Sequence, residues 1–497
     1  MADSAPLYDV AIVGLGPTGA MLANLLGAAG RSVLVLEKEA GIFPLPRAIH
    51  FDGEVLRVLQ SVGLREQVLA IARPGTQGMH FVNGTGQTLL VRGGTAALGP
   101  HGGANNYYFH QPELEAVLRA GLARYPQVDL RLGHELVGIA TQDDEVALQV
   151  RHAGGTESLR ARYLVGCDGA RSPVRQHMGS TMVDLGLRQP WLVFDVILQQ
   201  PVDLPDHTVQ HCDPRRPMTY CNVVGARRRW EIMVLPEDDR AALVQPESLW
   251  RLVAPWVRPE QAQLERAAIY TFHSVIAEGW RAGRLLLAGD ACHQTPPFLG
   301  QGMCAGIRDA ANLAWKLDAV LAGRSPEALL DTYESERKPH VRALIELAVR
   351  LGGIIQTTDA AEAAARDARF AAGRPEIFEL PPQLLGAGAF DPQAEAIAGR
   401  PFPQPRLRDG RLLDELLGRR SAVIGRRDTL QAAAPATAER WRRSDAIVID
   451  QPEPGIEAWL DAHGAQAVIL RPDRYIVGVA RTGPELDRIS QYLPVAP

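Results

Sequence analysis

The sequence has few cysteines, no apolar run suited to crossing a membrane, and no excess of basic charge. Its five cysteines form no CxxC pair, which argues against a zinc ribbon or a disulfide framework and favours a reducing compartment. They are Cys167, Cys212, Cys221, Cys292 and Cys304. With 52 basic and 57 acidic residues the net charge is −5, so the total gives no support for binding nucleic acid.

One uncharged stretch, from Val10 to Gly30, has the length of a signal peptide or a membrane span. Acidic residues, Asp3 and Asp9, precede it where a signal peptide carries lysine or arginine. A turn with glycine and proline interrupts it where a spanning helix would continue. We therefore expect a cytoplasmic protein without membrane contact. Its 497 residues exceed one compact core, so we expect two or three domains.

The uncharged stretch is better explained as two short elements around a glycine-rich turn. A buried strand, Asp9–Val13, leads into Gly14-Leu15-Gly16-Pro17-Thr18-Gly19, a helix follows, and a second strand ends at Glu37. This order is typical of a dinucleotide-binding unit, in which the glycines allow a tight turn, a close pyrophosphate and close packing of helix on strand. The helix N-terminus would attract the phosphates, and Glu37 would accept from ribose hydroxyls. An ordinary glycine turn is the alternative, and it leaves Glu37 unexplained.

Two later segments repeat the pattern of a strand that ends in a glycine turn with an acid. The first, Tyr163–Arg175, contains Cys167-Asp168-Gly169, and the second, Arg284–His293, contains Gly289-Asp290. The second continues through Pro296-Pro297-Phe298-Leu299-Gly300-Gln301-Gly302 into a predicted helix. That helix has the spacing of a buried apolar stripe at Ile307, Ala311, Ala314, Leu317 and Leu321.

In this order the three segments resemble the FAD-dependent aromatic hydroxylases of the para-hydroxybenzoate hydroxylase fold, most of all the 3-(3-hydroxyphenyl)propionate hydroxylases. The likeness runs from about Tyr8 to about Arg350 and includes Leu45-Pro46-Arg47-Ala48. It implies an α/β fold (α+β overall), with a Rossmann-like FAD-binding domain at 1–180 and 275–350. An antiparallel substrate-binding sheet at 181–274 would be inserted into that domain. FAD is the implied cofactor, and NADH or NADPH the implied co-substrate.

The resemblance also implies which residues contact the cofactor. The ADP half of FAD is expected on Gly14, Gly16, Pro17, Thr18, Gly19, Glu37 and Lys38. The phosphates and ribityl chain of FAD are expected on Arg47, Gln111 and Asp290. Asp168 and Gly169 resemble a second family motif, which is associated with both FAD and the nicotinamide nucleotide. The flavin ring is expected beside Gly289, Pro297, Gly300, Gly302 and Met303. Free N–H groups at a helix that begins near Met303 would favour the anionic reduced flavin there.

Between these motifs, short β-rich runs separated by turns predict a sheet that roofs the flavin. Side chains able to hydrogen-bond or deprotonate a phenol are His50, His211 and Tyr220, and these are the candidate substrate contacts. Each could equally point to solvent or make a structural bond. His50 and Tyr220, together with Pro297, are also the candidate catalytic residues. No metal-ligand cluster occurs, so no metal is expected, which suits chemistry carried by an organic cofactor.

After Arg350 the composition changes. We expect a helix and linker at 351–406, then alternating strands and helices at 407–497. The segment Arg471-Pro472-Asp473-Arg474-Tyr475 resembles a turn and strand of the thioredoxin-like C-terminal domain of some relatives. No cysteine follows Cys304, so disulfide exchange is excluded there. A packing or dimer-contact role, with a homodimer as its result, is the expectation.

The implied activity is hydroxylation of a phenolic or related aromatic substrate with NAD(P)H and dioxygen, through a flavin C4a-hydroperoxide. Two alternatives stay open: an FAD-dependent oxidase or dehydrogenase without hydroxylation, and a non-catalytic flavin-binding protein. The sequence does not identify the aromatic substrate, the ring position or the nicotinamide nucleotide.

Overall fold

The computed structural model describes residues 6–93, 98–371, 376–378, 384–394 and 397–495. Its first unit is built on parallel strands in the order β18-β11-β1-β2-β8. They are β1 (Leu7–Val13), β2 (Val33–Glu37), β8 (Val128–Leu132), β11 (Gly155–Gly166) and β18 (Leu285–Leu287). Their residues are mostly apolar and buried, as a parallel sheet covered on both faces requires. At one edge β17 (Arg281–Ala282) pairs with β18, while β9 (Glu135–Thr141) and β10 (Val146–His152) extend β11 as antiparallel strands.

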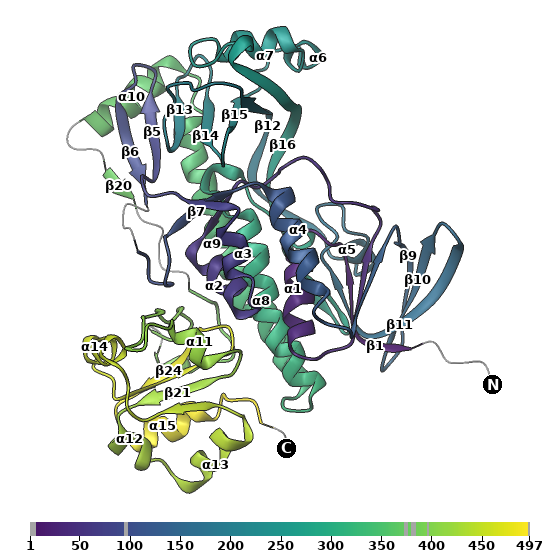
Figure 1. The fold of residues 1–497 in the computed structure, drawn as a ribbon, viewed down its shortest axis with the longest axis vertical. Coiled ribbons are helices and arrows are strands. Elements are labelled where there is room, and N and C mark those ends of the chain that lie inside the picture. Colours follow the sequence, from purple (N-terminus) through teal and green to yellow (C-terminus); the bar gives the residue numbers. More distant parts are fainter. Residues whose placement is uncertain (1–5, 94–97, 372–375, 379–383, 395–396, 496–497) are drawn as a thin grey trace.

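Helices pack on this sheet and position both glycine turns. The first, α1 (Pro17–Ala28), contacts α4 (Gln111–Leu122) and α8 (Gly302–Leu321), so that three segments distant in sequence lie side by side (Figure 1). The helix expected near Met303 thus begins one residue earlier. The remaining helices and strands of this unit are α2 (Gly53–Ser61), α3 (Arg65–Leu69), α5 (Pro173–His177), β3 (His50–Asp52), β4 (Ala72–Pro74) and β7 (Asn106–Phe109).

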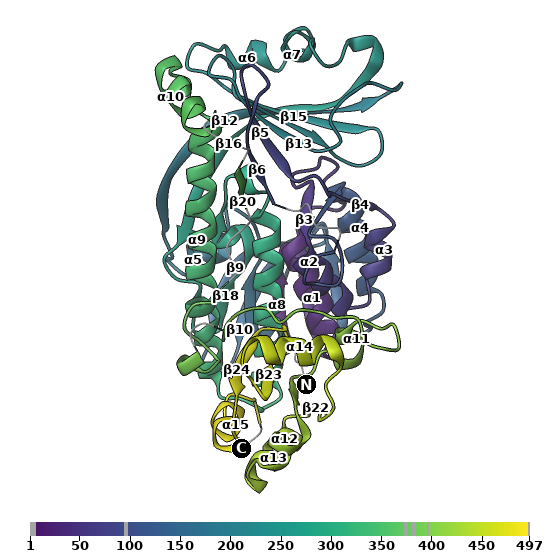
Figure 2. The same ribbon diagram turned by 90° about the vertical axis from the view of Figure 1, so that its left-hand side faces the viewer.

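The second unit is a nine-stranded sheet in the order β19-β16-β12-β15-β14-β13-β5-β6-β20. The long strands β12 (Met182–Leu198) and β16 (Ala262–Ala277) pair antiparallel along most of their lengths. The other members are β5 (Met79–Asn83), β6 (Thr88–Arg92), β13 (Thr208–Cys212), β14 (Met218–Asn222), β15 (Arg227–Met233), β19 (His293–Gln294) and β20 (Glu376–Phe378). Figure 2 shows this sheet across one end of the first unit.

The predicted boundaries of the inserted sheet, 181–274, therefore need correction. Strands β5 and β6 come from inside the range assigned to the FAD-binding domain, and β20 comes from the range predicted as helix and linker. The physical reason is that β5 pairs parallel with β13, a non-local contact that leaves no sequence signal. Helix α9 (Asp331–Ile355) also continues beyond 350, and α10 (Ala360–Ala371) follows it. Two short helices, α6 (Arg240–Leu243) and α7 (Pro246–Val253), cover the outer face of the nine-stranded sheet.

The C-terminal unit has a four-stranded mixed sheet in the order β22-β21-β23-β24. The alternating sequence pattern predicts strands at 421–425, 446–449, 467–470 and 475–479, and the structure has them, within a residue, as β21 (Ala422–Gly425), β22 (Ile447–Ile449), β23 (Ala467–Leu470) and β24 (Ile476–Ala480). Helices α11 (Leu413–Leu417), α12 (Arg427–Gln431), α13 (Pro435–Arg443), α14 (Pro454–Ala462) and α15 (Gly483–Ser490) accompany them. In the described part of the chain, no helix is both long and apolar enough to cross a membrane.

Candidate functional site

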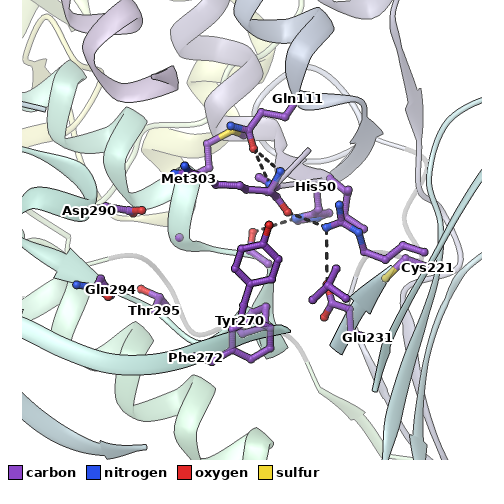
Figure 3. A pocket seen from close by; sticks show the side chains of 18 of the residues that line it. His50, Gln111, Cys221, Glu231, Tyr270, Phe272, Asp290, Gln294, Thr295 and Met303 are labelled. Carbon is purple, nitrogen blue, oxygen red and sulfur yellow. Dashed lines mark hydrogen bonds and ion pairs between the residues drawn. The ribbon is translucent and has the colours of Figure 1, made fainter. Parts of the chain in front are cut away.

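A cavity of about 1070 Å³ lies between the parallel sheet and the nine-stranded sheet (Figure 3). On one side it is bordered by the first glycine turn, by Asp290 and by the start of α8. On the other side it is bordered by side chains of the nine-stranded sheet, among them Thr219, Glu231 and Tyr270. The carboxyl ends of parallel strands are the usual binding edge of such sheets, so this is the expected location of a ligand.

The three glycines of the first turn each meet a different steric demand. Gly14 has φ +95°, and a Cβ there would lie 2.4 Å from the Cys167 carbonyl oxygen. A Cβ on Gly19 would lie 2.0 Å from the Gly14 carbonyl oxygen, because α1 packs directly on the strand. A Cβ on Gly16 would meet nothing within 4 Å, and Gly16 lines the cavity. The open position is therefore the one nearest the ligand, where a phosphate needs the backbone to be accessible.

The end of β2 supports this turn. The Glu37 carboxylate accepts a hydrogen bond from the Leu15 N–H at 2.8 Å and another from the Glu39 N–H at 3.0 Å. Glu37 thus fixes the glycine loop, a role that the sequence pattern did not reveal. Lys38 is exposed at the surface. Pro17 and Thr18 border the cavity at the start of α1, whose N-terminus receives no side-chain hydrogen bond.

The second motif places Gly169 on the cavity and Asp168 behind it. One oxygen of Asp168 accepts from the Val174 N–H at 3.1 Å, whereas its buried Oδ1 has no hydrogen-bond partner among the described residues. Burial raises the pKa of this carboxyl, opposed by its hydrogen bonds with Ser172 and the Val174 backbone. Asp168 therefore holds its own loop through the hydrogen bond from Val174, while its Oδ1 accepts no hydrogen bond from the described residues.

The third motif directs Asp290 into the cavity, where Figure 3 shows its side chain. Gly289 precedes it with φ +64°, and a Cβ there would lie 2.6 Å from the Thr18 hydroxyl oxygen. Close packing of the two glycine turns is therefore what aims Asp290 inward. Burial raises the pKa of Asp290, and the positive charges of His293 and Arg47 oppose this shift.

The segment before α8 borders the cavity through Pro297 and Gly300, and the start of α8 borders it through Gly302 and Met303. Gly300 has φ +63°, and a Cβ there would come within 3.0 Å of His50 Nδ1. The side chain of Gln301, the residue directly before α8, makes no hydrogen bond that caps the helix. The first N–H groups of the helix thus keep their capacity to meet a negatively charged ligand.

Arg47 and Gln111 belong to one hydrogen-bonded loop. The side-chain oxygen of Gln111 accepts from the N–H groups of Arg47 at 3.0 Å and Ala48 at 2.6 Å. Its amide nitrogen donates to Glu115 at 2.8 Å. The buried guanidinium of Arg229 donates to the carbonyl oxygens of Arg47 and Pro46 at 2.7 and 2.8 Å. Gln111 and Arg229 therefore fix the loop from two sides, while the Arg47 side chain remains exposed beside the cavity.

His50 lines the cavity beside the start of α8. Its Nδ1 lies 3.2 Å from the Gly300 carbonyl oxygen and its Nε2 lies 2.8 Å from the Asn106 side-chain oxygen. Burial and the nearby Arg92 lower the pKa of the imidazole. Both nitrogens contact protein oxygen atoms, so the ring of His50 is held in place from two sides.

The structure corrects the predictions for Tyr220 and His211. Tyr220 is 2% exposed, packs against Trp230 and donates to the Pro205 carbonyl oxygen at 3.1 Å. The ring of His211 packs against Trp256, with centroids 5.2 Å apart. Their strand neighbours Thr219 and Gln210 line the cavity instead. The predicted faces are reversed because the sheet is covered on both sides, so alternation does not distinguish cavity from core.

Several cavity residues were missed by the sequence interpretation. Tyr270 and Phe272 are two apart on β16 and share one face, a spacing that could have indicated them. Figure 3 shows both rings in the cavity wall. Glu231 on β15 borders the same space. Nothing local marks Glu231, because its surroundings are assembled from neighbouring strands.

A buried ion cluster adjoins these residues, and its two arginines, Arg229 and Arg266, also line the cavity. Asp195 accepts from Arg229, with Nε 2.7 Å from Oδ1, and its Oδ2 lies 2.9 Å from Arg266 Nε. Arg266 also donates to the Tyr270 hydroxyl at 3.2 Å. All three charged side chains are at most 3% exposed. The cluster therefore links the Arg47 loop to the sheet and orients Tyr270.

Comparisons with known proteins agree with this arrangement. Residues 7–348 match the family described as FAD binding domain. A probable NADH-specific resorcinol 4-hydroxylase of Rhodococcus jostii (strain RHA1) is 40% identical, over 98% of this chain and 95% of its own length. A 3-(3-hydroxy-phenyl)propionate/3-hydroxycinnamic acid hydroxylase of Burkholderia cenocepacia (strain HI2424) is 36% identical, over 94% and 93%. Aklavinone-11 hydroxylase, solved with FAD and aklavinone, has the same fold, with a TM-score of 0.81 at 24% identity over 98% and 99% of the chains.

Proposed function

This chain belongs to the FAD-binding-domain family of flavoprotein aromatic hydroxylases, and from that premise we propose that its substrate is a phenol. Its cofactor is FAD, and its co-substrate is a reduced nicotinamide nucleotide. The proposed reaction places one oxygen atom of dioxygen on a ring carbon ortho or para to the phenol oxygen.

The residues of the cavity fit FAD. The backbone at Gly16 is open toward the cavity, and neither α1 nor α8 receives a side-chain cap at its N-terminus. Both features suit a ligand with phosphates and an anionic ring edge. Asp290 faces the cavity, as a partner for hydroxyl groups would.

The observation that carries the proposal is the continuity of one cavity. It joins the phosphate-type turn at Gly16 to a wall with the aromatic rings of Tyr270 and Phe272. FAD, reduced by the nicotinamide nucleotide, supplies the activation of dioxygen. We propose that Gly16, Thr18, Asp290 and the start of α8 hold the cofactor.

The remaining residues act by position. Arg229 and Gln111 fix the Arg47 loop, and the ring of His50 is held beside Gly300. Tyr270 and Phe272 present apolar surface that excludes water and holds an aromatic ring. A phenol oxygen that donates its proton to a side chain in this wall gains electron density in the ring, which is the feature that electrophilic hydroxylation needs.

The test measures NADH and NADPH oxidation by the purified holoprotein with a panel of phenols, together with hydrogen peroxide and product. We expect one or more phenols to stimulate oxidation and to gain one oxygen atom, derived from isotopically labelled dioxygen. Oxygen consumption without a nicotinamide nucleotide would support the oxidase alternative. Bound FAD with no phenol-dependent oxidation across the panel would support the non-catalytic alternative.

A further inference from the structure

One carboxylate borders the substrate end of the cavity. Glu231 lies on β15, directly across from Thr219 on β14 and Val193 on β12, and all three line the cavity. Figure 3 shows Glu231 and Tyr270 entering this region from different strands. Glu231 is 9% exposed, so its carboxylate meets the cavity rather than bulk solvent. A carboxylate in such a place needs a partner, because burial of an unpaired charge is costly.

The protein supplies that partner only incompletely. Both nearby guanidinium groups, of Arg229 and Arg266, are ion-paired with Asp195 at 2.7 and 2.9 Å. The closest cationic atom to Glu231 is Arg229 Nη1, 3.7 Å from Oε1, and that nitrogen donates its hydrogen bond to the Arg47 carbonyl oxygen. Within the described residues, no N–H or O–H donates a hydrogen bond to the Glu231 carboxylate.

The polar neighbours of Glu231 in the sheet differ from it, because they hydrogen-bond one another. The Thr219 hydroxyl donates to the Gln210 side-chain oxygen at 2.7 Å, and the Gln210 amide contacts the sulfur of Met79 at 3.3 Å. These polar groups of the wall satisfy one another. Glu231 alone in this cross-strand row keeps its acceptor capacity for a group inside the cavity.

We propose that Glu231 determines specificity: its carboxylate accepts a hydrogen bond from a hydroxyl of an uncharged phenol and disfavours aromatic substrates that carry a carboxylate. This inference rests on the proposed function and adds the substrate class. Burial raises the pKa of Glu231, opposed by Arg229, as expected of a carboxylate with little solvation. Such a group gains from a hydroxyl donor and repels a second carboxylate strongly, since little water screens the pair.

Arg92 is one of several cavity cations and could favour the opposite outcome; Arg229 and Arg266 also line the cavity, but both are ion-paired with Asp195. Arg92 borders the cavity from β6 and donates to the Leu299 carbonyl oxygen at 2.6 Å. Its charge contributes to the lowered pKa of His50, which places it beside the start of α8 and not in the row of Glu231. If Arg92 rather than Glu231 governs recognition, a substrate with a carboxylate is preferred. The two assignments thus predict opposite substrate preferences.

The experiment compares three substrates that share a meta-substituted phenol ring: resorcinol, 3-(3-hydroxyphenyl)propionate, and the uncharged amide of that acid. The acid and the amide differ in charge at nearly equal size, so their ratio of kcat/KM isolates the effect of charge. We expect wild-type protein to use resorcinol best and the amide at least about tenfold better than the acid. Glu231→Gln should lower the amide-to-acid ratio at least about tenfold and reduce product formed per NAD(P)H with resorcinol.

Two further variants complete the test. Glu231→Asp keeps the charge and should keep the amide-to-acid preference, while Glu237→Gln makes the same chemical change at an exposed site after β15 and should change nothing. An amide-to-acid ratio that stays within about twofold in Glu231→Gln, or a wild type that prefers the acid, would overturn the inference. If Glu231→Gln loses FAD, the wild-type preference alone decides. Absence of hydroxylated product from every phenol in wild type would instead refute the proposed function.

Discussion

A buried hydroxyl of the C-terminal unit contacts a charged cluster beside the start of α8, and its removal should have a measurable cost. The Tyr475 hydroxyl donates to Glu54 Oε1 at 2.7 Å, and Arg308 donates to Glu54 Oε2 at 2.6 Å. Arg308 also donates to Asp52 at 2.6 Å and to the side chain of Gln301, directly before α8, at 3.1 Å. The chain of contacts therefore runs from the last unit to the start of the helix that borders the cavity.

The charges of this cluster determine how much folding stability Tyr475→Phe should lose. Two carboxylates share one guanidinium, and burial lowers the pKa of the adjacent His101 to about 4, so that ring is neutral at pH 7. The Tyr475 hydroxyl thus supplies the second strong donor to Glu54. In Tyr475→Phe a buried carboxylate loses a hydrogen bond, which costs about 1.5–3 kcal/mol, a ten- to hundredfold change in the folding equilibrium.

The sign of the pH dependence follows from Glu54. Burial would raise its pKa, but Arg308 outweighs burial and the folded value lies near 2. A carboxyl whose pKa is depressed on folding stabilises the protein above its unfolded pKa and loses that contribution as the pH falls through the folded value. The cost of Tyr475→Phe should therefore be complete at pH 7 and shrink below about pH 4.

The assay is urea unfolding of the holoprotein, followed by flavin fluorescence for FAD release and by circular dichroism for structure. Tyr492→Phe, at a tyrosine that is 36% exposed in the same unit, is the matched control. We expect Tyr475→Phe to release FAD at a lower urea concentration and the control to match wild type. Equal midpoints for the two variants, or a loss below about 0.5 kcal/mol, would refute the coupling.

Three further predictions concern the cofactor side and the sheet. Gly14→Ala should destabilise the protein even without FAD, because a Cβ there overlaps the Cys167 carbonyl. Gly16→Ala should instead leave the apoprotein stable and weaken FAD binding. Unfolding of the two apoproteins and titration with FAD separate the effect on stability from the effect on binding. Asp290→Ala should weaken FAD binding about tenfold or more, through loss of charge-assisted hydrogen bonds, and equal FAD affinity in a fluorescence titration would contradict this. Tyr220→Phe should leave product formed per NAD(P)H unchanged, because its hydroxyl bonds Pro205 outside the cavity, and an increase in hydrogen peroxide would show that this placement is wrong.

The parts of the molecule that depend on local backbone geometry were predictable from the sequence. The turn from Gly14 to Gly19 has its strand, helix and open position where the spacing predicts them, because Gly14 and Gly19 answer steric demands made within a few residues or by one neighbouring strand, while Gly16 stays open. The four strands of the C-terminal sheet were likewise found from short apolar runs between turns. The thioredoxin-like character of that unit stays a prediction.

The parts that depend on pairing between distant segments were not predictable. Strand β5 lies at 79–83 yet pairs with β13, so no boundary in composition marks its transfer to the other sheet. Tyr220 was assigned to the cavity because it alternates with apolar neighbours, but α7 gives the outer face of the sheet an apolar core of its own. Because both faces of the sheet are buried, the alternation of side chains identifies the strand but does not show which of its faces lines the cavity.

The same limit explains why the polar wall of the cavity was missed. Arg229 and Glu231 are two apart on β15 and so share a face, whereas only the register of β12 on β15 brings Asp195 beside Arg229. Asp195 takes the shorter ion pair, so Glu231 is left facing the cavity; had the pairing been exchanged, Asp195 would be the free acceptor. Local sequence contains the charges but not this division between them. The register that places Asp195 beside Arg229 thus decides which acid of the wall keeps a free acceptor toward the cavity.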